Sequence, residues 1–334
     1  MKKDISEELN IVILMAGNGT RMKSFTPKPF IKIGGLQLFL HILNTMKNID
    51  YKTNIIEVIS KFEENEINKI HKNEYNVNYT IQENKFGTGH ATLCALKSKF
   101  WKSENKYTGI FYGDVPFVSE KTIKKMVALQ KNYDLIVLGF IAKDQEKQYG
   151  RLFLKEDLLI GQWGRLDEIK EFKDLPREKP KFCNSGIYFG KTEIFEKLLP
   201  QIKNDNNKQK EYYLTDIVKI ANENNLKVGT YICEELEVVG VNTKIELEEA
   251  EQILQQKLKN NFMLNGTTMI NAKSIYVSYD TKIGKDVIIE PNVFIGTNVV
   301  IGNNCTIKAG SYLENVNVPD NTIVRANSVL IVEK

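Results

Sequence analysis

A glycine-containing loop near the N-terminus carries the residues with the clearest chemical potential. The segment ILMAGNGTRMKSFTPK, residues 13–28, follows an apolar run and places Gly17 and Gly19 one residue apart, with Arg21 and Lys28 behind them. Such a loop lets backbone N–H groups approach a polyphosphate, while the two cations supply positive charge. It is neither a P-loop nor a GxGxxG dinucleotide fingerprint. It predicts a triphosphate cradle, although a GxG turn taken alone is more often structural.

A second candidate is Asp114, the last residue of the segment GIFYGD. Mg²⁺ prefers oxygen ligands and uses only one or two protein groups beside phosphates and water. A carboxylate at the end of a strand can therefore serve as such a ligand. The alternative, an aspartate that caps a turn or helix before Pro116, is equally compatible with this short stretch alone.

Further motifs narrow the interpretation. GNGTRM followed by PK resembles the signature loop of sugar nucleotidylyltransferases. The chain also resembles, in motif order and spacing, the uridylyltransferase domain of bifunctional N-acetylglucosamine-1-phosphate uridylyltransferase/glucosamine-1-phosphate acetyltransferases. The motifs are IQENKFGTGHA (81–91), YGDVP (112–116), YGR (149–151), CNSG (183–186), EYYLTD (211–216) and VVGVNTK (238–244). Seven ordered motifs are far more specific than any one of them, and the resemblance covers almost all of residues 10–250.

The resemblance implies a role for each matched position. The residues that contact the nucleotide would be Leu14, Ala16 and Gly17, and the catalytic cations that bind its phosphates would be Arg21 and Lys28. Those around the uracil ring would be Gln82, Gly87 and Thr88. Mg²⁺ would be held by Asp114 and Asn242. Those around the sugar would be Tyr112, Gly150, Glu171, Asn184, Tyr213 and Thr215, of which Glu171 is matched through the looser segment IKEFKD.

The implied reaction agrees with these residue types. An oxygen of the sugar phosphate attacks the α-phosphorus of UTP in line and expels pyrophosphate. That oxygen is already an anion at neutral pH, so the reaction needs no general base. It needs positioning and neutralisation of charge, which lysine, arginine and Mg²⁺ provide. The expected substrates are UTP and a hexosamine 1-phosphate, with N-acetylglucosamine 1-phosphate as the first choice.

Two alternatives stay open at this stage. One is a nucleotidylyltransferase for another pair, such as dTTP and glucose 1-phosphate, which TPKPF (26–30) favours and FGTGHA, YGDVP and VVGVNTK oppose. The other is a catalytically silent nucleotide-sugar-binding subunit, because a fold can be kept while the residues of its active site are lost. The joint presence of its cations and metal ligands, Arg21, Lys28, Asp114 and Asn242, argues against the second.

The elements that must position these residues follow from the hydrophobic pattern. From residue 10 to about 242, short β-branched runs such as IVILMAG, IIEVIS and LIVLGF alternate with longer helical stretches. This predicts an α/β fold with a mainly parallel sheet and ligands at the carboxyl ends of strands. The resemblance implies, more closely, a Rossmann-like mixed sheet of the nucleotide-diphospho-sugar transferase type. Residues 244–262 are expected to form a connecting helix. We therefore predict domains at 1–243 and 263–334, joined by that helix.

The C-terminal segment has a strict period of six. Its aliphatic positions are Val277, Ile283, Ile289, Ile295, Ile301, Ile307 and Leu313, with a second series at Val287, Val293, Val299 and Cys305. Gly284, Gly296 and Gly302 follow the first series, as a tight corner would require. The period predicts a short parallel β-helix, and the resemblance implies that it is left-handed. About seven hexads cannot cover both ends of their own core, and β-helices of the resembled kind pack side by side as trimers, so the resemblance implies a homotrimer through the β-helix. The resembled acetyltransferase site uses a histidine base, whereas the histidines here are His41, His71 and His90, so no acetyltransferase activity is expected.

The bulk composition excludes several classes. The chain has 334 residues, 42% of them hydrophobic, and no apolar run approaches the roughly 20 residues of a membrane span. A net charge of +4 from 46 basic and 42 acidic residues is too balanced to indicate nucleic acid. The four cysteines are scattered without a CxxC pair, which favours a reduced, cytoplasmic setting over disulfides or zinc.

Overall fold

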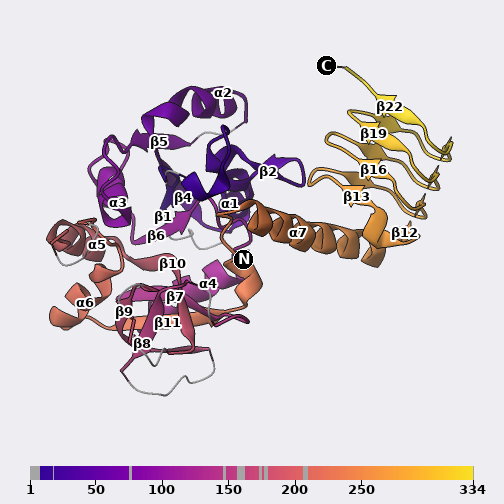
Figure 1. Cartoon of the computed structure of the whole chain (residues 1–334). Helices are drawn as coiled ribbons and strands as arrows, with labels where there is room; N and C mark the ends of the chain where they lie inside the picture. The colour runs from indigo at the N-terminus through magenta and orange to yellow at the C-terminus, as the bar shows by residue number, and fades with distance from the viewer. Residues whose placement is uncertain are drawn as a thin grey trace, which may run out of the picture. The chain divides into compact units, whose positions relative to one another are not determined.

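A computed structural model describes residues 8–17, 19–74, 77–145, 148–155, 162–172, 175–176, 180–205 and 210–333 (Figure 1). The chain divides into two compact units. The first takes Met1–Pro29 and Leu38–Gly240, and the second takes Phe30–Gln37 and Val241–Lys334. This division differs from the predicted domain limits in two ways. The short segment Phe30–Gln37 groups with the second unit, and so does the helix that was expected to stand as a connector.

The first unit contains a mixed sheet of nine described strands in the order β5-β4-β1-β6-β10-β7-β11-β9-β8. Parallel pairing joins β1 to β4 and β6, β4 to β5, and β7 to β11, whereas β10 runs antiparallel to β6 and β7. The predicted mixed, mainly parallel sheet is confirmed. The strands are β1 (Glu8–Leu14), β4 (Lys52–Ile59), β5 (Asn78–Ile81), β6 (Tyr107–Tyr112), β7 (Leu135–Ile141), β8 (Arg151–Leu154), β9 (Trp163–Lys170), β10 (Phe182–Lys191) and β11 (Val228–Cys233).

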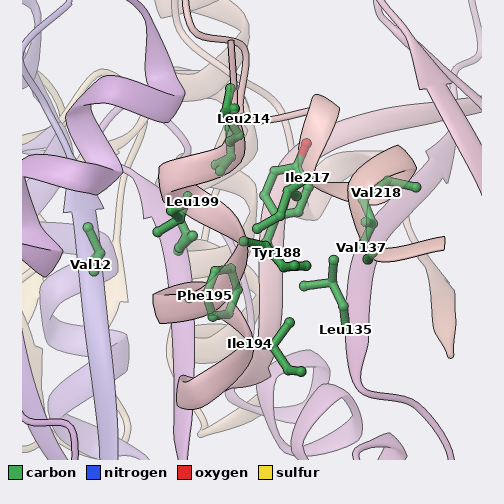
Figure 2. Close-up of a cluster of buried hydrophobic side chains, with 14 of the residues drawn as sticks. Val12, Leu135, Val137, Tyr188, Ile194, Phe195, Leu199, Leu214, Ile217 and Val218 are labelled. Atoms are coloured by element: carbon green, nitrogen blue, oxygen red, sulfur yellow. The ribbon is translucent and has the colours of Figure 1, made fainter. Parts of the chain in front are cut away.

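Alternating strand residues bury one face of this sheet under helices. Val12, Ile110 and Val137 belong to a buried cluster with Phe195 and Ile217, which lie on two of the covering helices (Figure 2). Because successive strand side chains point to opposite faces, neighbours such as Ile11 and Ile13 are buried on the other face. The helices of this unit are α1 (Leu38–Asn48), α2 (Glu64–Glu74), α3 (Thr88–Leu96), α4 (Glu120–Leu129), α5 (Thr192–Leu198) and α6 (Asp216–Glu223).

The parallel register brings the ends of three strands to one edge of the sheet. Leu14, the last residue of β1, lies opposite Val58 of β4 and Tyr112 of β6. Beyond the strands, Met15 N donates to Val58 O (2.8 Å) and Gly113 N donates to Leu14 O (3.0 Å). The loops that follow β1, β4 and β6 therefore leave the sheet together, at the edge where open α/β sheets bind ligands.

The second unit contains the short left-handed parallel β-helix that the six-residue period and the resemblance predict. Its three parallel sheets have the orders β12-β15-β18-β21, β13-β16-β19-β22 and β14-β17-β20. Both hexad series point inward, with Val277, Ile295 and Val299 among the fully buried residues. The strands are β12 (Thr268–Met269), β13 (Tyr276–Val277), β14 (Lys282–Ile283), β15 (Ile288–Ile289), β16 (Phe294–Ile295), β17 (Val300–Ile301), β18 (Thr306–Ile307), β19 (Tyr312–Glu314), β20 (Asn317–Val318), β21 (Ile323–Val324) and β22 (Val329–Ile331).

The corners of the β-helix are built differently from the prediction. Gly284, Gly296 and Gly302 are not among the residues with positive φ; asparagines, one aspartate and Gly310 take the left-handed corners instead, at φ between 51° and 73°. The glycines are needed for close stacking of successive coils, because a Cβ on Gly302 would lie 3.0 Å from the Asp320 Cα. The expectation that these glycines form the tight corners is therefore wrong.

Helix α7 (Lys244–Leu264) and the hairpin β2 (Lys32–Ile33)–β3 (Leu36–Gln37) complete the second unit. Gln255 of α7 donates through Nε2 to Val277 O (2.7 Å) and accepts from Val277 N (3.0 Å), so one buried amide replaces a missing strand neighbour. At the hairpin turn, Gly34 N donates to Glu251 Oε2 (2.8 Å), and Gly34 O accepts from Ser278 Oγ (2.9 Å). In the described ranges no helix is both long and apolar enough to cross a membrane.

Candidate active site at the carboxyl edge of the sheet

The glycine loop, residues 15–28, folds closely on itself after β1. Gly17 is exposed, its N–H donates to Met15 O (2.9 Å), and no described atom lies within 4 Å of the position of an added Cβ. Gly19 has φ 56°, and a Cβ there would lie 3.1 Å from the Lys28 Cβ. The first glycine thus leaves its backbone open on one side, and the second lets the chain pass against Lys28. Leu14 and Ala16 are buried, so a nucleotide at this loop would meet their main-chain atoms.

Lys28 and Asp114 form an ion pair within this edge, with the Lys28 ammonium donating to the Asp114 Oδ2. Their side chains are only 13% and 21% exposed. Asp114 is held there by the turn after β6, where Val115 N donates to Tyr112 O (3.2 Å). The structure therefore joins the predicted phosphate lysine and the predicted metal carboxylate, which lie 86 residues apart in the chain. Arg21, in the 3₁₀ turn Thr20–Met22, is exposed.

The residues predicted around the base form a second group on the same side of the sheet. Gln82 follows β5, and its amide nitrogen donates to Gly87 O (3.1 Å). The turn at Gly87, with φ 103°, requires glycine because a Cβ would lie 2.7 Å from Tyr212 O. Thr88 Oγ1 accepts from Leu214 N (3.1 Å), and Gly89 N donates to Tyr212 O (2.8 Å). These bonds hold the segment around Tyr213 beside the Gln82–Thr88 loop.

Tyr112 connects the base group with the sugar group. Its hydroxyl bonds to the Thr88 side chain, and a Cβ on Gly186 would lie 2.7 Å from its ring carbon Cε2. Burial raises the pKa of Tyr112 well above its ordinary value, and the carboxylates of Glu171 and Asp114 act in the same direction. The phenol therefore stays protonated and can donate a hydrogen bond.

The predicted sugar residues Gly150, Glu171, Asn184 and Thr215 lie together. Thr215 Oγ1 donates to Glu171 Oε1 (3.2 Å), and Asn184 N donates to Gly150 O (2.9 Å). A Cβ on Gly150 would lie 3.6 Å from Glu171 Oε2 and 3.7 Å from the Asn184 Cβ. Even the loosely matched Glu171 thus lies within this group.

A bulge in β10 aims Asn184 at the group. The register with β7 shifts between Asn184 and Tyr188, and Gly186 inside the bulge has φ 82°. Asn184 Oδ1 accepts from Gly186 N (2.9 Å), which leaves the amide hydrogens of Asn184 pointing elsewhere. Bulges commonly re-aim a side chain beside an active site.

Sequence reasoning missed one supporting residue, Arg151. Its guanidinium is fully buried, and it donates to Tyr149 O (2.8 Å) and to Gln145 O (2.7 Å). The bond to Tyr149 O holds the residue directly before Gly150. The signal was present in the motif YGR, which was assigned a role only through its glycine.

The predicted metal ligands differ in their placement. Asp114 lies in the first unit, whereas Asn242 lies in the second, where its N–H donates to Glu246 Oε2 (2.9 Å). Their pairing around one ion stays a prediction. Among the described residues, no group of three or more histidine, cysteine, aspartate or glutamate side chains could hold a metal by itself. The two predicted oxygen donors, from Asp114 and Asn242, suit an ion that is also bound by phosphate oxygens and water, as Mg²⁺ is.

Comparison with known proteins identifies the class of this fold and site. A family model described as Nucleotidyl transferase matches residues 10–236, and one described as Bacterial transferase hexapeptide (six repeats) matches residues 280–315. The chain belongs to the nucleotidyl transferase family.

Within that family, the chain is similar to proteins named Bifunctional protein GlmU. It is 33% identical over 324 residues to the one from Clostridium botulinum (strain ATCC 19397 / Type A), which covers 96% of this chain and 68% of that protein. It is 36% identical over 279 residues to the one from Clostridium kluyveri (strain NBRC 12016), covering 82% and 58%. The predicted resemblance is confirmed, and this chain spans about three fifths to two thirds of these relatives.

Solved structures support the fold. A UDP-glucose pyrophosphorylase complexed with UDP-glucose superposes with a TM-score of 0.58 at 19% identity, covering 75% of this chain and 99% of that one. A 4-diphosphocytidyl-2C-methyl-D-erythritol synthase from Anaerococcus prevotii gives a TM-score of 0.51 at 18% identity, covering 75% and 96%. At these identities the likeness concerns the fold alone.

Proposed function

We propose that this protein is a sugar-1-phosphate uridylyltransferase that converts UTP and N-acetylglucosamine 1-phosphate into UDP-N-acetylglucosamine and pyrophosphate. The observation that carries the proposal is the gathering of Lys28, Asp114 and the glycine loop at one sheet edge, next to a polar group around Glu171 and Asn184. The family and the similarity to the GlmU proteins support the same reaction class. We place the protein in the cytoplasm, with no nucleic-acid or membrane partner.

In this proposal the residues position two polyanions and neutralise them. Lys28 and Arg21 bind the phosphates of UTP, and the main chain at Leu14, Ala16 and Gly17 follows the nucleotide. Gln82, Gly87 and Thr88 hold the base. The sugar contacts Tyr112, Gly150, Glu171, Asn184, Tyr213 and Thr215. Since the attacking phosphate oxygen is already ionised, the rate comes from alignment and charge stabilisation.

Asp114 and Asn242 would hold Mg²⁺, which would supply further neutralisation of the phosphate charge when bound. The Asp114 carboxylate suits this role because it is partly exposed and its described partner, Lys28, is one that phosphates can also bind. In the nucleotide complex we therefore expect Lys28 to turn to the phosphates while Asp114 turns to the ion. No acetyltransferase activity is proposed, since the three histidines of the sequence, His41, His71 and His90, all precede the β-helix.

The test of this function is release of pyrophosphate with Mg²⁺, measured for UTP, dTTP, CTP and ATP against three sugar phosphates: the 1-phosphates of N-acetylglucosamine, glucosamine and glucose. We expect the highest kcat/KM for UTP with N-acetylglucosamine 1-phosphate. A preference for dTTP with glucose 1-phosphate would instead support the first alternative. The absence of turnover with every pair would support the silent binding subunit.

We also propose that the β-helix assembles the protein as a homotrimer. The outer positions of its sheets carry exposed apolar side chains, among them Ile288, Phe294 and Val300. Tyr276, Phe294 and Tyr312 stack in a ladder, with ring centroids 4.4 and 4.8 Å apart. Light scattering at increasing protein concentration should give three times the mass of the chain. A mass equal to one chain at every concentration would contradict the trimer.

A further inference from the structure

The orientation of the Gln82 side-chain amide is fixed by its neighbours. Gln82 is 4% exposed, and its side-chain nitrogen lies 3.1 Å from Gly87 O and 3.0 Å from the Nδ1 of His90. A backbone carbonyl oxygen can only accept, so the amide group beside it must be the NH₂ and not the oxygen. The hydrogen-bond network alone therefore assigns which end of the amide faces inward.

The same network assigns the state of His90. One amide hydrogen goes to Gly87 O, and the other points at Nδ1, which must therefore accept; the ring is neutral with its proton on Nε2. Burial lowers the pKa of His90 and the charge of Lys97 lowers it further, while a hydrogen bond to the Asn84 backbone opposes both. The ring is also packed edge-on against Phe86, with centroids 5.3 Å apart. These surroundings favour the neutral acceptor.

We propose that His90 is a positioning residue that makes the site selective for uracil over cytosine. With both amide hydrogens of Gln82 used inside the protein, its Oε1 is the group left for a ligand. The N3 of uracil carries a hydrogen that Oε1 can accept, whereas the N3 of cytosine is itself an acceptor and would be repelled. This inference rests on the proposed function, which places the base at Gln82.

The Gly87 carbonyl alone holds the amide less well than two acceptors do. If phenylalanine replaced His90, one amide hydrogen of Gln82 would be buried without an acceptor, and nothing would fix the orientation of the amide. Gln82 would then present either end to the base. His90 adds selectivity in this way without touching the nucleotide itself.

The experiment compares binding of UTP and CTP, each with Mg²⁺, to the full-length wild type, His90→Phe and His90→Asn by calorimetry, together with kcat and KM. His90→Phe keeps an aromatic ring but removes the acceptor, and we expect its Kd for UTP to rise about tenfold while its Kd for CTP falls or stays unchanged, because a turned amide offers a donor to the N3 of cytosine. We expect kcat to stay within about twofold, because the chemistry occurs elsewhere. His90→Asn offers an oxygen near the place of Nδ1 and should restore most of the UTP affinity.

Two results would overturn the inference. One is a His90→Phe protein that keeps the wild-type ratio of UTP to CTP affinity, whether both affinities persist or both fall together. The other is a ¹⁵N spectrum of the wild type, with His90 assigned by comparison with His90→Asn, that shows the proton on Nδ1; this spectrum decides the matter even where His90→Phe does not fold. A wild type without any preference for UTP would instead refute the proposed function, so the two failures are distinguishable.

Discussion

Replacing Asp114 by asparagine should lower kcat by at least about a hundredfold without unfolding the protein, because charge stabilisation at the phosphates supplies most of the rate in phosphoryl chemistry. Asparagine keeps the size and one oxygen of the aspartate but loses the negative charge that, in the proposed role, would hold a divalent ion. The side chain is 21% exposed, so the substitution leaves no buried cavity. The measurement is steady-state pyrophosphate release across a range of Mg²⁺ concentrations, beside a thermal unfolding curve.

Asp134 offers a matched control. It also pairs with a lysine, Lys191 (2.6 Å), but it precedes β7 and so lies at the opposite, amino edge of the sheet. Asp134→Asn should change kcat by less than about twofold, because a partly exposed ion pair remote from the site affects stability slightly. An Asp114→Asn protein that retained more than about a tenth of the wild-type kcat would contradict the ligand role, given how much charge neutralisation contributes.

Replacing Lys28 by methionine should raise the affinity for a divalent ion and lower kcat/KM for UTP. The ammonium neutralises Asp114 in the ligand-free protein, so its removal should let a divalent ion alone, probed as Mn²⁺, bind about tenfold more tightly. The same change removes a cation from the phosphates, so kcat/KM for UTP should fall by a factor of about a hundred or more. Calorimetry with Mn²⁺ and steady-state kinetics with UTP measure the two effects.

Lys191→Met serves as the control for this pair, since it breaks an equivalent contact at the other edge of the sheet. It should leave both quantities within about twofold of the wild type. If Lys28→Met weakened Mn²⁺ binding, or left kcat/KM unchanged, the proposed exchange of partners between Lys28 and Asp114 would be contradicted.

Local patterns in the sequence were enough to predict much of the fold. The β-branched runs predicted the strands. A glycine or aspartate at the end of a run, as at Gly17 and Asp114, predicted the edge of the sheet at which ligands are expected. The six-residue period predicted the inward positions of the β-helix from Val277 to Leu313. These features are readable because each depends on residues that are close in the chain.

Features that depend on contacts between distant segments could not be predicted. Nothing in the local sequence of Phe30–Gln37 indicates a distant partner, yet Gly34 hydrogen-bonds to Glu251 and Ser278, more than 200 residues later. After Leu313 the β-helix shortens one coil by a residue, so that Val300 pairs with Asn317 and not with residue 318. A period measured upstream of that point contains no information about the change.

The same limit applies to the candidate site, where contacts between distant loops could not be predicted from the sequence. Its residue types were predicted from motifs, but the ion pair of Lys28 with Asp114 and the approach of Gly186 to Tyr112 depend on how separate loops meet. None of the motifs assigned His90 a role in the site. Its bond to Gln82 spans eight positions across a turn, and only the geometry of that turn shows which nitrogen accepts.

The most direct measurement is a crystal structure of this protein with UTP and Mg²⁺. The account predicts that the triphosphate lies along the glycine loop, with the Lys28 ammonium on phosphate oxygens and the Asp114 carboxylate on the metal, and that the bond between these two side chains is broken. A nucleotide bound elsewhere, with Lys28 and Asp114 still joined to each other, would contradict it.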